Sequence, residues 1–308
     1  MAFQRAAGYS NLANGNFSPT IYSQKVQLAF RNKSVIQSIS NNDYMGELSG
    51  YGDTVKIIKE PDITINSYAR GGTSTPQDLA DDEVSLIIDK ANEFNFKVDD
   101  IEAKHSHVNW ESLASGRAGY KLADTMDQEC LSYIEGQISS ASPDHLIGTT
   151  SAPQDVQLAK TSGDFTPLEL LNRFKRLLDE QNVPEEGRWA VIDPYFAELL
   201  GDEDSKLLSE DFTNKGIVRN GMVGQGMVRG FQLHMSNNLT TSGDGPSGTG
   251  YGYLLAGHKS CVATAEQINK VETLRSETSF ADIVRGLHVY GRKVLRQESL
   301  VGAVYHTA

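Results

Sequence analysis

The most regular pattern in the sequence is an apolar stripe that predicts one long helix over residues 110–139. Apolar residues at every fourth position lie on one face of an α-helix. A continuous helix of this length would span about 45 Å at 1.5 Å per residue, and it would exceed the ~10–14 residues of an average helix. Pro143 follows and ends the pattern. The stripe consists of Ala118, Leu122, Met126, Cys130, Ile134 and Ile138.

Residues 46–104 show a different pattern, in which apolar and polar positions alternate as they do in β-strands. Between the alternating runs stands RGGTSTPQD (70–78), in which Gly71, Gly72 and Pro76 predict a turn. The segment is therefore interpreted as a long hairpin with little core of its own. Two-stranded ribbons are marginal in water, so we expect it to lie on another molecule. The four runs are DTVKII (53–58), DITINSY (62–68), VSLIID (84–89) and EFNFKVDDIE (93–102).

Residues 165–274 carry the signals of a compact unit of helices and strands. Thr166 and Glu169 have the spacing of a capping box, with Pro167 at the first helical position. The helix that follows has a leucine-rich stripe and stops before Pro184. The remaining predicted elements are a buried strand RWAVID (188–193), a helix YFAELL (195–200) capped by Asp193, and a strand YLLAG (253–257).

The two flanking segments differ from each other. Residues 1–45 are rich in Ser, Asn, Gly and Gln and hold too few apolar residues to fold alone, so we expect an arm. Residues 281–308 return to short apolar runs that predict strands.

The composition favours a folded protein with an acidic surface. Of its 308 residues 39% are hydrophobic, and 28 basic against 40 acidic residues give a formal net charge of -12. This charge argues against nucleic acid as the main partner, because phosphate binding needs a basic contact face. Residues 1–42 carry four basic residues and no acid, whereas 78–102 carry nine acids and two lysines. Opposite signs would set register between copies of a self-associating chain, although solvated faces are the simpler interpretation.

Cysteine content and hydropathy indicate the compartment. Two cysteines do not make a disulfide scaffold, so a reducing compartment such as the cytoplasm is expected. The stretch MAFQRAAGYSNLANGNF lacks the apolar core of a secretory signal. No run approaches the roughly 18 apolar residues that a membrane helix needs. We therefore expect synthesis in the cytoplasm and no membrane partner.

Two stretches resemble phosphate-binding motifs, but each departs from its motif at a position that the motif requires. GYLLAGHKS (252–260) resembles a phosphate loop, but His258 stands between the second glycine and the lysine, and YLLAG favours a strand. GQGMVRG (224–230) has Arg229 where the dinucleotide fingerprint needs its third glycine. A tight-turn strand pair is the favoured interpretation there.

Signals for a metal or a nucleophile are equally weak. Glu102, His105 and His107 cluster in sequence, and the histidines would share a strand face, but spacing fixes no third ligand. A polar segment between ribbon and helix is the simpler interpretation. No serine has the Gly-x-Ser-x-Gly setting, and Cys130 lies on the helix stripe, where packing explains it. We expect no catalytic residue, no metal and no cofactor.

Five stretches, in their order along the chain, carry a resemblance to a known family. They are GDTVKI (52–57), SLIIDKANEFNFKVDDIE (85–102), RWAVIDPYFAELL (188–200), AGHKSCVATAEQINKVE (256–272) and FADIVRGLHVYGRKVLR (280–296). They are similar to the corresponding stretches of the major capsid, or coat, proteins of tailed bacteriophages. The resemblance covers nearly the whole chain, and its specificity lies in the joint order of the stretches.

The resemblance implies the α+β HK97-type capsid fold. Its parts would be an N-terminal arm (1–45), an extended loop with flanking strands (46–104), a peripheral domain with a spine helix (105–164 and 275–308) and an axial domain (165–274). It implies a structural protein of the virion that self-assembles into pentamers and hexamers of an icosahedral head and encloses double-stranded DNA without sequence-specific binding. A portal, a separate scaffolding protein and a decoration protein would be further partners.

Charged and turn residues of the ribbon and the arm are the candidates for contacts between copies. Arg70 at the predicted ribbon tip is suited to pair with acids of a neighbour, although a solvated arginine is an equally simple interpretation. Two other classes stay open: an encapsulin-like nanocompartment shell with the same fold, and a small-molecule enzyme that uses the compact unit. The candidates are Arg70, Gly71, Gly72, Asp81, Asp82, Glu83, Arg5, Lys25 and Arg31.

Overall fold

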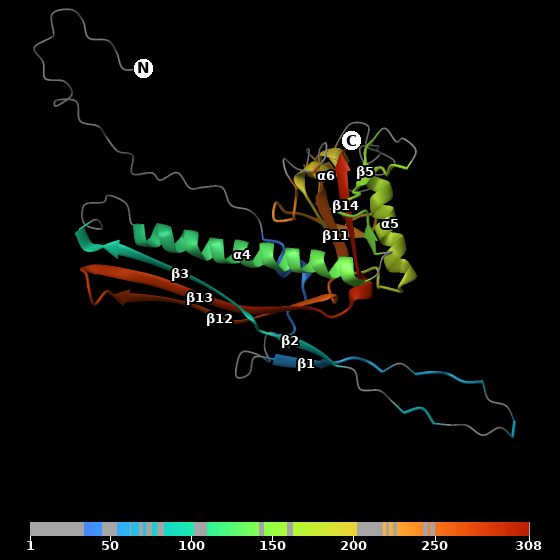
Figure 1. Ribbon diagram of the computed structural model, residues 1–308, viewed down its shortest axis with the longest axis horizontal. Helices are drawn as coiled ribbons and strands as arrows, with labels where there is room; N and C mark the ends of the chain where they lie inside the picture. The colour runs from blue at the N-terminus through green and yellow to red at the C-terminus, as the bar shows by residue number, and fades with distance from the viewer. Residues whose placement is uncertain are drawn as a thin grey trace, which may run out of the picture.

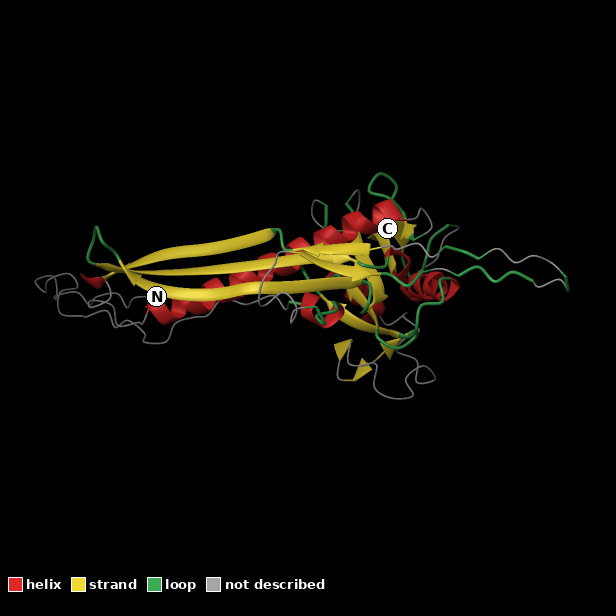
Figure 2. Ribbon diagram, turned by 90° about the horizontal axis from the view of Figure 1, so that it is seen from below, coloured by secondary structure: helices red, strands yellow, loops and turns green. Residues whose placement is uncertain are grey.

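Two bodies of secondary structure lie end to end in the computed structural model, and a ribbon leaves their junction (Figure 1, Figure 2). One body is a long helix over a three-stranded sheet, and the other is a seven-stranded sheet with two helices. No helix in the described part of the chain is long and apolar enough to cross a membrane. The structure describes residues 34–44, 54–61, 63–67, 70–71, 76–78, 83–101, 110–141, 145–158, 163–201, 218–219, 222–223, 227–242, 246 and 250–307.

Helix α4 (Trp110–Ala141) confirms the long helix that the apolar stripe predicts. Gly116 and Gly119 do not interrupt it. The helix lies over an antiparallel sheet in which β13 is the central strand and β12 and β3 are the edges (Figure 1). These strands are β3 (Lys90–Asp99), β12 (Val262–Arg275) and β13 (Ala281–Val294).

The second body is built on a mixed sheet of seven strands. Its order is β4-β14-β11-β6-β10-β9, with β5 beside β14, and every residue of β6 is buried. Such a strand has helices or chain on both faces, which explains the apolar run from Trp189 to Ile192. The strands are β4 (Leu146–Ile147), β5 (Gln154–Val156), β6 (Arg188–Ile192), β9 (Met227–Val228), β10 (Phe231–Met235), β11 (Gly252–His258) and β14 (Leu300–Thr307).

The two helices of this body begin as predicted. In α5 (Pro167–Glu180) the Glu169 N–H donates to Thr166 Oγ1 at 3.3 Å, and the Thr166 N–H donates to Glu169 Oε2 at 3.2 Å. These reciprocal bonds confirm the capping box. In α6 (Pro194–Gly201) the Phe196 N–H donates to Asp193 Oδ1 at 3.0 Å.

Two large apolar clusters hold the molecule together. One joins α5 to the seven-stranded sheet through residues such as Phe174 and Leu171. The other packs the second half of α4, including Ile134 and Cys130, against Trp189 of β6 and residues of both sheets. The long helix is therefore shared by the two bodies and fixes them to each other.

The ribbon consists of β1 (Thr54–Ile58) and β2 (Glu83–Ile87), paired antiparallel. The predicted strand DITINSY (62–68) is wrong for the described residues 63–67, which have no strand partner and form none. Strands exist only where a partner satisfies their hydrogen bonds. The remaining short elements are α1 (Ile36–Ile39), β7 (Val218–Arg219), β8 (Met222–Val223) and η2 (Gln297–Ser299).

Strands from different predicted regions pair in the same sheet. Strand β12 begins within residues 165–274 and ends at Arg275, and it pairs with β13 beneath α4. Strand β14 lies within 275–308 but joins the seven-stranded sheet, and β3, within 46–104, is an edge of the sheet beneath α4. Each region therefore supplies strands to its neighbours, and the division into four regions stays a prediction.

Candidate self-association surface

The ribbon presents apolar side chains to solvent. A Lys56 Nζ–Glu83 Oε1 ion pair of 2.6 Å links its two strands, and an exposed pair of this kind adds about 0–1 kcal/mol. Beyond it, Ile58, Ile63 and Ile65 are 75%, 66% and 92% exposed. A series of exposed aliphatic residues is typical of a surface that another molecule covers.

The tip of the ribbon is a turn at Arg70 and Gly71. Gly71 has φ +87, in the left-handed region that favours glycine. Arg70 is exposed and has no ion-pair partner among the described residues. The limbs on either side are linked by the Thr64 N–H, which donates to Gln77 Oε1 at 2.9 Å.

A cluster of charged and aromatic residues fixes the root of the ribbon to the body. Glu129 of α4 lies 2.8 Å from Arg292 of β13 and 3.7 Å from Lys90 of β3, measured from its Oε1. The Tyr290 hydroxyl donates to the other Glu129 oxygen. Burial and this bond raise the pKa of Tyr290. The Arg292 guanidinium also lies 4.8 Å from the Tyr133 ring centroid. The Glu129 carboxylate thus links α4 to β13 and to the start of β3, where the chain arrives from the ribbon strand β2.

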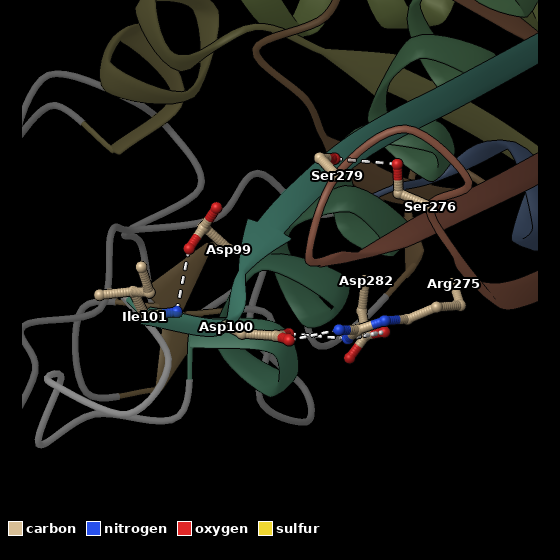
Figure 3. Close-up of polar contacts among 7 residues, drawn as sticks. All are labelled: Asp99, Asp100, Ile101, Arg275, Ser276, Ser279 and Asp282. Atoms are coloured by element: carbon tan, nitrogen blue, oxygen red, sulfur yellow. Dashed lines mark hydrogen bonds and ion pairs between the residues drawn. The ribbon is translucent and has the colours of Figure 1, made fainter.

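At the far end of the three-stranded sheet, one arginine joins residues from all three strand ends (Figure 3). Arg275 Nη1 donates to Asp100 Oδ1 at 2.7 Å and to Asp282 Oδ1 at 3.1 Å. Beside it, Ile101 and Phe280 are 66% and 82% exposed. This sheet tip combines a fixed charge cluster with two bare apolar side chains, a composition typical of contact surfaces.

Two hydrogen bonds between residues close in sequence shape the chain at the sheet tip (Figure 3). The Ile101 N–H donates to Asp99 Oδ1 at 2.9 Å. The Ser276 and Ser279 hydroxyl oxygens lie 2.9 Å apart across the turn between β12 and β13. Both bonds are local and shape the two chain segments that the Arg275–Asp100 contact joins.

A buried aspartate of α4 anchors the segment that leads into α1. Asp127 Oδ1 accepts the Val35 N–H at 2.7 Å, the Ile36 N–H at 2.8 Å and the Ser34 hydroxyl at 3.0 Å. Its other oxygen accepts from Asn238 Nδ2 at 2.9 Å. The carboxylate is fully satisfied, as a buried charge must be. Asp127 therefore holds residues 34–36 against α4 at the start of α1.

The stretches that resemble binding motifs have structural roles. Residues 252–258 form β11, which confirms the strand interpretation of the phosphate-loop-like stretch. Arg229 (φ +53) and Gly230 (φ +88) form a tight turn between β9 and β10, which confirms the strand pair.

No group of three His, Cys, Asp or Glu side chains that could hold a metal occurs among the described residues. Glu102, His105 and His107 lie outside them. Burial raises the pKa of the Cys130 thiol to about 12 and also raises the pKa of Cys261. Both thiols are core groups, as the helix stripe predicts for Cys130.

Solved phage structures share this arrangement along nearly the whole chain. One from Mycobacterium phage Che8 superposes with a TM-score of 0.74 at 27% identity, over 95% of this chain and 98% of that chain. The capsid of cyanophage P-SCSP1u gives 0.75 at 18% identity, over 100% and 99%. The chain has the HK97-type fold of phage capsid proteins. The mature capsid of bacteriophage PhiM1 gives 0.63 at 17% identity, over 94% and 92%. No protein-family model and no curated protein matches the sequence.

The parts of the HK97-type fold are recognisable in the described residues. Helix α4 is the spine helix, and the three-stranded sheet beneath it is the peripheral-domain sheet. The ribbon with β1 and β2 is the extended loop, and the seven-stranded body is the axial domain. The resemblance to phage coat proteins inferred from the sequence is confirmed.

The predicted contact residues are only partly within the described structure. Arg70 and Gly71 form the ribbon tip, whereas Glu83 lies at the other end of the limb and pairs with Lys56 of the same chain. Their role in contacts between copies stays a prediction. The other candidates lie outside the described residues: Gly72, Asp81, Asp82, Arg5, Lys25 and Arg31.

Sequence reasoning missed the sheet tip and the buried anchor. The signal for the sheet tip was Phe280, an aromatic residue in an otherwise polar turn. The signal for the anchor was Asp127, an acid beside Met126 on the apolar stripe of the long helix. Acids on such a face are buried with a partner.

Proposed function

We propose that the chain is the shell subunit of a phage head and that it self-assembles into pentamers and hexamers of an icosahedral capsid. The observation that carries this proposal is the length of the match, which reaches 95% and 100% of the chain against the structures from phage Che8 and cyanophage P-SCSP1u. A fold shared over the whole chain supports a shared architecture, whereas function has to be tested on its own.

The exposed surfaces of the protomer support self-association. Ile65 in the ribbon and Phe280 at the sheet tip are 92% and 82% exposed, and the ribbon and the far end of the three-stranded sheet point in opposite directions (Figure 1). Copies of the chain would cover both. Each contact can be weak, because every subunit in a closed shell makes several at once.

The net charge of -12 fits a wall that encloses DNA without gripping it. We propose packaged double-stranded DNA as the content of the shell, in a virion whose subunits are made in the host cytoplasm. DNA needs an entry point, and a growing shell needs a guide for its curvature. A portal protein and a separate scaffolding protein are therefore proposed partners, and a decoration protein is a further one.

Arg70 is the proposed charged contact of the ribbon tip. Its partner would be an acid of a neighbouring copy, so the contact should weaken as salt screens it. Arg70→Glu should lower particle yield and heat resistance, and particles should lose stability from low to high salt. Arg173→Glu, at an exposed residue of α5, makes the same change in charge away from the ribbon. Equal behaviour of the two variants would remove Arg70 from the contact.

Electron microscopy of the purified chain tests the proposal directly. Closed particles of uniform size are expected, alone or with the scaffolding protein. A stable monomer or small oligomer under both conditions would refute the shell and favour the enzyme alternative. Nuclease-protected DNA inside particles from infected cells distinguishes a phage head from a nanocompartment, which would hold protein cargo instead.

A further inference from the structure

A groove opens between α4 and the sheet beneath it. Its volume is about 160 Å³, and most of its lining is apolar, including Phe94, Leu122 and Met126. Val271 of β12 also lines it and is exposed, so solvent reaches the groove. An apolar cavity of about 150 Å³ holds a benzene molecule. The groove therefore has room for one aromatic ring or a short alkyl chain.

One carboxylate lies in this lining. The Glu266 side chain is 20% exposed, and its Oε2 lies 3.2 Å from His288 Nε2. The hydrogen bond from His288 is the main cause that lowers the pKa of Glu266, so the carboxyl is ionised at neutral pH. The two oxygens of a carboxylate offer about four acceptor sites, and His288 and Gln37 donate to Glu266. Glu266 therefore keeps capacity for one more donor.

The negative charge of Glu266 is uncompensated within the described part of the chain. No lysine or arginine described there pairs with this carboxylate. The second ring nitrogen of His288, Nδ1, is buried and bonds no described residue, so no acceptor holds a second proton on the ring. At pH 8 such an imidazole is neutral. The groove thus combines an apolar wall with one full negative charge.

We propose that this groove binds a small amphipathic amine, in which an aromatic ring or short alkyl chain carries one primary ammonium group. The apolar part would lie against Phe94, Leu122 and Met126, and the ammonium would donate to Glu266. Hydrogen bonds between ionised partners are about twice as strong as neutral ones. A small anion would meet the like charge of Glu266. The site belongs to the single chain and does not depend on the proposed shell function.

Calorimetric titration of the unassembled chain with 2-phenylethylammonium at pH 8 tests the proposal. This probe has one ring, and its amine is charged at that pH because alkylamines titrate near pH 10. We expect saturable binding with one site per chain. The neutral probe 2-phenylethanol has nearly the same shape and should bind at least about tenfold more weakly, because it lacks the charged donor.

A matched pair of variants locates the ammonium. Glu266→Gln keeps an acceptor and removes the charge, so it should weaken the amine about tenfold and leave the alcohol unchanged. Glu93→Gln makes the same change on the other face of the sheet, since Glu93 precedes the groove residue Phe94 on β3. This control should leave the affinities for both probes unchanged.

A third variant locates the apolar part of the ligand. Gly119 of α4 lines the groove, and a Cβ there meets no atom within 4 Å. Gly119→Leu should fill the groove and abolish binding of both probes. A urea midpoint at or above that of the wild type would show that the variant is folded. Undiminished binding by this folded variant would place the ligand elsewhere and overturn the proposal.

Three further results would overturn it: no saturable binding, equal affinity for amine and alcohol, or equal effects of Glu266→Gln and Glu93→Gln. A lysine side chain carries the same ammonium group as the probe. Binding that is absent from the unassembled chain would assign the groove to a lysine of the chain itself. Binding that is lost when particles form would assign it to a lysine of another copy. Either result overturns a free amine as the ligand and leaves the shell function intact.

Discussion

Strand β13 passes the root of the ribbon so closely that residue 291 has to be glycine. A Cβ on Gly291 would lie 2.4 Å from the Ile87 carbonyl oxygen and 2.9 Å from the Ile88 Cα, where ordinary contact begins at 3.4 Å. Both obstacles are backbone atoms, so no side-chain rotation relieves them. We expect Gly291→Ala to push the β2–β3 connection away from the sheet.

The size of the effect follows from two opposing terms. Overpacking of this kind costs about 1–3 kcal/mol, and loss of glycine freedom in the unfolded chain returns about 0.4–1 kcal/mol. The midpoints of these ranges, about 2 and about 0.7 kcal/mol, leave a net destabilisation of about 1.3 kcal/mol for Gly291→Ala, measured by urea unfolding of the unassembled chain. Because the displaced backbone carries the ribbon, particle yield should fall further than stability alone implies.

The control is a glycine with open space around it. Gly116 lies exposed in α4, and a Cβ there meets no atom within 4 Å. Gly116→Ala should stabilise the helix by about 0.5–1 kcal/mol and leave assembly unchanged. If Gly291→Ala is as stable as the wild type and assembles normally, the close crossing does not hold the ribbon and the reasoning fails.

Three further predictions concern buried polar groups. Asp127→Ala leaves the donors at residues 34–36 without an acceptor, so it should lower the free energy of unfolding by about 1–3 kcal/mol. It should also speed proteolytic cleavage before residue 40. Unchanged cleavage would contradict the role of Asp127 as an anchor. Burial raises the pKa of Asp193, so the stability that this carboxyl contributes is complete below its unfolded pKa of about 4 and is lost as pH rises through the folded pKa. Asp193→Asn should therefore gain stability relative to the wild type as pH rises, which urea midpoints from acid to neutral pH will check. Cys130 and Cys261, whose thiol pKa values burial raises, should react with a thiol reagent only after unfolding; fast labelling of the folded chain would contradict their burial.

The elements that the sequence predicted well are those fixed by local rules. The spacing of Met126, Cys130 and Ile134 is enough to define a helix face, and the Thr166–Glu169 capping box is complete within four residues. Both were confirmed. Turn residues likewise placed the tip of the ribbon at Arg70 and Gly71.

The misses concern interactions between distant residues. Residues 62–68 alternate like a strand, but pairing needs a partner that the described chain does not provide. The sheets to which β12 and β14 belong are set by contacts with β13 and β11, and a local pattern does not encode them. The role of Asp127 depends on residues 34–36, more than ninety positions away in sequence. A single sequence shows that an acid is out of place on an apolar face but does not name its partners.

The position of β14 sets the order in which the molecule can fold. This strand lies inside the seven-stranded sheet, between β11 and the pair β4 and β5, and all of these precede it in the chain. Contacts between such distant residues form late, because the intervening chain must close first. The axial core is therefore sealed only after the ribosome has passed residue 307. A partly synthesised subunit that lacks β14 has its ribbon but an incomplete seven-stranded sheet, and on the proposed function it would not yet be ready to join other copies.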